Sequence, residues 1–181
     1  MKRLAILLAL ALPFAAAAAD YTVQPALSTL GFSNTFQGES FDGKFGQWTA
    51  AIRYDAANLA SSKFDVEVNL ASAKTGDSDR DSALPGSDFF NVAKFPKAHF
   101  VTTGFRQVGG KVIADGTLTL HGVTKPVSLA VTFKPQAGGA TLDVAGTVKR
   151  LDFGVGTGDY ADTSVIGGDV KVTAHLQLAA K

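Results

Sequence analysis

Apolar and polar residues alternate with a period of two along most of the chain. In residues 114–120, for example, Ala, Gly and two Leu alternate with Asp and two Thr. This pattern is typical of a half-buried antiparallel strand. It predicts eight strands, at about 30–36, 48–54, 64–70, 98–107, 114–120, 127–133, 142–148 and 170–178. Breaks containing Gly, Asp or Asn separate them, and such regular spacing indicates an antiparallel barrel or sandwich.

Two interruptions of the pattern are informative. His121 and Gly122 occupy a two-residue hairpin turn, where Gly tolerates the positive φ that such turns need. We expect His121 to bond to backbone there. Residues 76–92 lack period two, and Asp77 or Ser78 can cap a short helix that the Pro-Gly pair at 85–86 ends. This helical insert, between the third and fourth predicted strands, would lie across one end of a barrel.

The first 19 residues have the pattern of a secretory signal peptide. Lys2 and Arg3 precede an apolar stretch, and Ala residues at 17–19 offer a cleavage site. The apolar stretch at 4–19 is shorter than the ~20 residues that a membrane-spanning helix needs. We therefore expect export to the periplasm, cleavage near Ala19, and a single mature domain at 20–181.

Composition excludes several classes of function. The sequence contains no Cys, so it forms no disulfide and has no thiolate chemistry. Its net charge of +1 becomes −1 without Lys2 and Arg3. A nearly neutral mature chain lacks both the basic surface that nucleic acid requires and the polybasic cluster that binds anionic lipid.

The candidate metal and catalytic motifs are weak. Asp77, Asp79 and Asp81 resemble the start of a calcium loop, but Ser82 takes the position that needs Gly. Helix capping explains these acids more simply. The three His residues are scattered, the Gly-rich run at 154–158 has no helix after it, and no nucleophile motif is present. The sequence thus predicts no metal site, no cofactor beyond a bound ligand and no catalytic residues.

The apolar side of the strands is the remaining candidate site. Barrels of eight strands have an interior that is either packed by side chains or able to hold one ligand. Small residues at inward positions favour a lumen, and they are Ala50, Ala114, Gly116, Gly146 and Ala174. Composition alone leaves both possibilities open.

Three motifs resemble those of the YceI-like family in order and spacing. They are GTLTLHGVTKPV at 116–127, TGDSDRDSALPGSDFFNV at 75–92 followed by Phe95 and Pro96, and KRLDFGV at 149–155. The resemblance covers essentially the whole mature chain. It implies an all-β, eight-stranded, lipocalin-like antiparallel barrel that holds an isoprenoid lipid, either a quinone such as ubiquinone or a polyprenyl phosphate. The chain would then be a periplasmic carrier and not an enzyme.

Two sets of residues would form this lipid site. The lumen set comprises inward residues of the predicted strands, which are Phe32, Trp48, Ile52, Phe64, Val66, Phe100, Gly116, Leu118, Leu129, Val131, Val144, Val172, Ala174 and Leu176. The mouth set comes from the insert and contains Arg80, Asp81, Asp88, Phe89 and Phe90. Arg80 and Asp81 would either form a polar rim near a head group or an ion pair that fixes the helix on the sheet.

Two other functions remain open. The protein could assist a membrane redox enzyme, such as a cytochrome, that acts on bound quinone, or it could capture hydrophobic toxins or antibiotics. A lipid-delivery partner is compatible with each of them. The sequence leaves the oligomeric state open between monomer and dimer.

Overall fold

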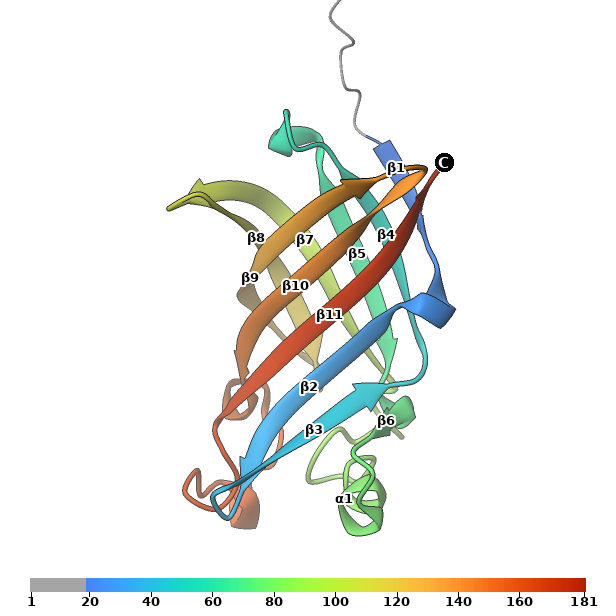
Figure 1. Cartoon of the computed structure of the whole chain (residues 1–181). Coiled ribbons are helices and arrows are strands. Elements are labelled where there is room, and N and C mark those ends of the chain that lie inside the picture. Colours follow the sequence, from blue (N-terminus) through green and yellow to red (C-terminus); the bar gives the residue numbers. More distant parts are fainter. Residues whose placement is uncertain (1–18) are drawn as a thin grey trace, which may run out of the picture.

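The computed structural model describes residues 19–181 and consists almost entirely of β-strands (Figure 1). Its strands are β1 (Ala19–Val23), β2 (Thr29–Phe36), β3 (Glu39–Phe45), β4 (Trp48–Tyr54), β5 (Lys63–Asn69), β6 (Ala73–Lys74), β7 (Lys97–Val108), β8 (Lys111–Leu120), β9 (Val123–Gln136), β10 (Gly139–Lys149) and β11 (Asp169–Ala180). The helices are α1 (Ser78–Ala83) and the short 3-10 helices η1 (Pro25–Leu27), η2 (Leu59–Ser61), η3 (Leu70–Ser72), η4 (Arg150–Phe153) and η5 (Gly158–Tyr160).

Eight antiparallel strands close into a ring, in the order β1, β4, β5, β7, β8, β9, β10 and β11. The ring closes at β1, where Tyr21 pairs with Ile52 of β4 on one side and with Ala180 of β11 on the other. The all-β barrel of eight antiparallel strands is therefore confirmed.

The membership of the ring differs from the sequence prediction. The period-two pattern missed β1, β3 and β6, and it placed β2 among the eight barrel strands. One edge of β11 pairs with β2 from Lys171 to His175 and with β1 from Leu178 to Ala180. The hairpin of β2 and β3 then continues the wall toward β6. The barrel thus closes through β1, while β2, β3 and β6 extend the sheet from the other part of the β11 edge.

The predicted hairpin turn and helical insert are both present. His121 and Gly122 have φ values of 51° and 77°, and His121 Nδ1 bonds to the Phe153 carbonyl at 3.2 Å. Between β5 and β7, the Asp77 carboxylate caps α1 by accepting from the backbone of Asp79 and Arg80. Figure 1 places α1 at one end of the barrel, opposite β1 and the C-terminus.

Aromatic side chains fill the barrel at the β1 end. The ring of Tyr54 lies 4.5 Å from that of Phe133, and the rings of Phe64 and Phe105 are 5.0 Å apart. We call this the closed end. A second apolar cluster, which includes Phe32, lies toward α1. Only Ala19 of the expected signal segment falls within the described residues, where no helix is long and apolar enough to span a membrane.

Candidate functional site

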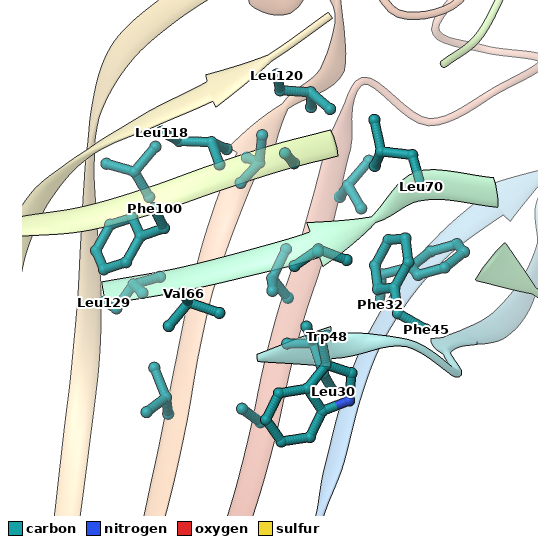
Figure 2. Close-up of a pocket in the computed structure, with 18 of the residues that line it drawn as sticks. Leu30, Phe32, Phe45, Trp48, Val66, Leu70, Phe100, Leu118, Leu120 and Leu129 are labelled. Carbon is teal, nitrogen blue, oxygen red and sulfur yellow. The ribbon is translucent and has the colours of Figure 1, made fainter. Parts of the chain in front are cut away.

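An apolar cavity lies inside the barrel. Its volume is about 240 Å³, more than ten times the ~10–15 Å³ that one water molecule requires. In Figure 2, Phe32, Trp48 and Phe100 extend into this space from β2, β4 and β7. The interior of the barrel is therefore hollow between the closed end and the insert.

Most of the expected lumen residues line the cavity. They are Phe32, Trp48, Ile52, Phe64, Val66, Phe100, Leu118, Leu129, Val144, Val172, Ala174 and Leu176. They come together because alternate residues of a strand share one face, and closure turns that face inward. Successive strands thus supply one continuous apolar wall.

Two expected lumen residues do not line the cavity. A Cβ atom at Gly116 would lie 2.6 Å from Cζ of Phe100, so the ring of Phe100 already occupies that space. Val131 is only 5% exposed and belongs to the closed-end core. Both residues have the expected inward phase, but neighbouring side chains cover them.

The mouth set is divided between the cavity and the support of the insert. Phe89 and Phe90 line the cavity, whereas Arg80, Asp81 and Asp88 do not. The guanidinium of Arg80 lies 4.5 Å above the centre of the Phe41 ring, which is itself in the wall. Asp81 accepts hydrogen bonds from the backbone and hydroxyl of Thr75. Arg80 and Asp81 are thus not paired with each other. Arg80 contacts Phe41 of β3, and Asp81 forms an ion pair at 3.8 Å with Lys74 of β6, so each attaches the insert to a different strand.

Further wall residues were absent from the predicted set. They are Leu30, Asn34, Phe41, Phe45, Ala50, Val68, Leu70, Leu84, Ala98, Leu120, Val127, Leu142, Val148, Arg150, Val155, Ile166 and Val170. Many share the inward phase of a predicted strand, and Phe41 and Phe45 carry the same signal in β3. Arg150 and Ile166 have no such signal.

Arg150 is a buried cation in the cavity wall. The residue is 3% exposed, and its guanidinium donates to five backbone carbonyls. These carbonyls belong to Val155, Gly156, Tyr160, Ile166 and Gly167. Burial lowers the pKa of Arg150. Because arginine has five N–H groups, all of its donors are engaged in holding residues 154–168 over the end of the barrel.

The other candidate polar groups have structural partners. His99 and His175 lie on the outer surface, 2.8 Å from Asp65 and 2.6 Å from Asp143. The His99 side chain lowers the pKa of Asp65. In residues 19–181, no three His, Cys, Asp or Glu residues gather closely enough to hold a metal ion. The cavity is thus the feature of the described chain that is best suited to a ligand.

Fold and cavity together define a lipocalin-like barrel with an apolar interior. A family model for the YceI-like domain matches residues 21–178, and the chain belongs to this family. A UPF0312 protein of Vibrio vulnificus is 36% identical over 168 residues, which are 86% of this chain and 89% of the relative. A UPF0312 protein of Pseudomonas syringae pv. tomato is 36% identical over 159 residues, covering 82% and 83%.

Solved structures have the same fold. BcnA of Burkholderia cenocepacia superposes with a TM-score of 0.82 at 29% identity, over 87% of this chain and 99% of BcnA. A polyisoprenoid binding domain from Saccharophagus degradans gives a TM-score of 0.66 over 91% of this chain and 100% of that domain. Its identity is 18%, so the likeness concerns the fold alone.

Proposed function

We propose that the protein binds an isoprenoid lipid in its barrel and carries it through the periplasm. The observation that carries this proposal is the hollow interior, whose wall is apolar apart from Asn34 and Arg150. Membership of the YceI-like family and the binding function named for the Saccharophagus degradans domain support it. A carrier needs no catalytic residues, in keeping with the sequence.

The length of the cavity suits part of a prenyl tail. Alternate residues of β11 from Val170 to Leu176 line it, a span of about 20 Å at ~3.3 Å per residue. An extended carbon chain advances ~3.5 Å per three backbone bonds, and each isoprene unit adds four backbone bonds. Roughly four extended isoprene units would therefore fit in this span. At ~0.8 kcal/mol per CH₂, they contribute about 16 kcal/mol before the cost of ordering the tail. Longer tails would fold back or leave through the mouth.

The wall favours an uncharged head group. Arg150 is the only cation among the lining residues, and its N–H groups are all donated to carbonyls. A phosphate would find no guanidinium donor here without releasing residues 154–168. An isoprenoid quinone is therefore the better candidate than a polyprenyl phosphate.

Fluorescence of Trp48 provides a direct test, because it is the single Trp and lines the cavity. Ligand-stripped mature protein is titrated with ubiquinones of two, four and eight isoprene units and with undecaprenyl phosphate. We expect saturable quenching by the quinones at one per chain, and affinity that levels off near four units. Absence of saturable binding by any prenyl lipid would contradict the proposal.

Export and cargo can be tested separately. Intact-mass measurement of the exported protein should give an N-terminus within a few residues of Asp20, and retention of Met1 would contradict export with cleavage. A role in capturing toxins would require a non-prenyl cargo. A role in assisting a membrane cytochrome would require a change in quinone turnover when the protein is removed.

A further inference from the structure

Three exposed apolar side chains gather at the α1 end of the barrel. Phe36, Tyr160 and Val165 are 39%, 41% and 40% exposed, and we call them the mouth patch. The other large exposed apolar residues among those described are Leu27 and Val108. Single exposed apolar residues are ordinary on protein surfaces, whereas a group of them marks an interaction site.

The mouth patch adjoins the cavity wall. Phe36 pairs with Ile166 in an isolated bridge, and the ring of Tyr160 lies 5.0 Å from that of Phe89. Ile166 and Phe89 both line the cavity. Figure 1 shows the β2–β3 turn, α1 and the segment before β11 at the same end of the barrel. A partner on the mouth patch would thus lie directly outside the cavity wall.

The segments around the mouth patch are strongly acidic. Residues 34–40, 75–92 and 154–168 contain seven acidic residues and one basic residue, Arg80, a net charge of −6. The acidic residues are Glu39, Asp77, Asp79, Asp81, Asp88, Asp159 and Asp162. Since residues 20–181 have a net charge of −1, the rest of the mature chain carries +5. Two cations outside these ranges contact them, because Lys74 lies 3.8 Å from Asp81 and the buried guanidinium of Arg150 donates to Tyr160 and Ile166. The mouth segments remain net negative, at −4, when both are counted.

Several of these acids lie directly beside the mouth patch. Glu39 is the cross-strand partner of Phe36, and Asp159 precedes Tyr160. Asp162 accepts from the Val165 backbone through its carbonyl, while the hydroxyl of Ser164 lowers the pKa of its carboxyl group. These residues place negative charge beside each member of the mouth patch.

We propose that the mouth patch and its acidic border form a docking surface for a protein with an apolar centre surrounded by Lys and Arg. Charge complementarity identifies this partner. An anionic bilayer attracts basic segments by ~1 kcal/mol per residue and, by the same interaction, opposes acidic ones. Opposite charge on a protein would speed association and orient the partner on the mouth patch. This docking goes beyond the proposed lipid binding.

A synthetic amphipathic helix of Leu and Lys serves as the probe, with a Leu/Glu helix as its charge control. The mature protein is saturated with quinone, so that the peptide does not enter the cavity. Binding is measured by fluorescence anisotropy and mapped by amide chemical shifts. The apolar test variants are Phe36→Ser and Val165→Ser, with Val108→Ser as their control away from the mouth patch. The charge test variant is Asp159→Lys, with Asp20→Lys as its control.

We expect the Leu/Lys helix to shift amides of the three mouth segments, and each mouth substitution to weaken binding about two- to fivefold. Added salt should weaken it further, while Val108→Ser and Asp20→Lys should leave it unchanged. Equal binding by all variants, shifts elsewhere, or binding to phosphatidylglycerol vesicles in preference to the peptide would overturn the proposal. Quinone titration of the same variants shows whether lipid binding is intact, so a failure of peptide docking can be distinguished from a failure of lipid binding.

Discussion

The ring of Phe100 packs against the backbone of Gly116 on the neighbouring strand. A Cβ atom at Gly116 would stand 2.6 Å from Cζ of this ring and 2.5 Å from the Val101 carbonyl oxygen. The pairing of β7 and β8 shifts register between Thr102 and Gly104, directly opposite Gly116 and Asp115. Glycine thus lets Phe100 lie close to the wall and leaves the cavity open.

Replacing Gly116 should disturb this arrangement. In Gly116→Ala the ring of Phe100 must move, so we expect a loss of about 1–3 kcal/mol in the free energy of unfolding, as in other overpacked sites. Urea denaturation measures it. Gly104→Ala is the matched control, because its Cβ would meet no atom within 4 Å. Equal stability of the two variants would contradict the close packing of Phe100.

The sequence predicted the inward phase of Gly116 but not its role. Period two assigns a residue to one face of a strand, and most of the residues that it placed in the lumen do line the cavity, although many other wall residues were not in the predicted set. It gives no information on the size of the side chain that crosses from the next strand. The space beside Gly116 was therefore expected in the lumen, whereas Phe100 fills it.

Ala174 tests the hollow interior. Its side chain lies in the cavity wall between Leu30 and Val144. We expect Ala174→Leu to occupy cavity volume, to keep the melting temperature of the ligand-free protein, and to shorten the longest prenyl tail that binds. The control is Ala140→Leu in the closed-end core, where Ala140 is 0% exposed and overpacking should cost ~1–3 kcal/mol. Destabilisation by Ala174→Leu as large as that of Ala140→Leu would indicate a filled interior.

Arg150 should be needed for the structure of residues 154–168. An ammonium group has three donors, so Arg150→Lys leaves at least two of the five carbonyls without a partner. At ~1–3 kcal/mol for each buried unsatisfied group, we expect a loss of roughly 2–6 kcal/mol. Arg53→Lys is the control, since Arg53 is half-exposed and pairs with Asp20 at the surface. A denaturation midpoint unchanged by Arg150→Lys would refute this role.

The burial of Arg150 could not have been predicted from sequence. A charged residue at the end of a strand is ordinarily expected in solvent. Its carbonyl partners lie as many as 17 residues along the chain in a segment without periodicity. Strand β1 was missed for a related reason, because five residues beside the signal segment are too few to establish a period. In both cases, contacts with residues distant in the sequence determine the structure, and the local sequence pattern does not reveal them.

Asp81 should contribute to the acid sensitivity of the insert. Its pKa is lowered from the usual 3.8, first by the hydrogen bond from the Thr75 backbone. A carboxyl group with a lowered folded pKa stabilises the protein above its unfolded pKa, and the contribution disappears as pH falls through the folded value. Unfolding measured between pH 5 and 2 should therefore depend less on pH in Asp81→Asn than in the wild type. Parallel curves for the two proteins would count against this contribution.

The cargo of the native protein tests the central claim most directly. The protein is purified from the cells that produce it without added detergent, and mass spectrometry identifies and quantifies the lipids in an organic extract. We expect one isoprenoid lipid per chain with an uncharged head group, and less of it or a shorter tail in Ala174→Leu. An extract that holds no prenyl lipid, from a barrel that also fails to take up ubiquinone in vitro, would contradict the account.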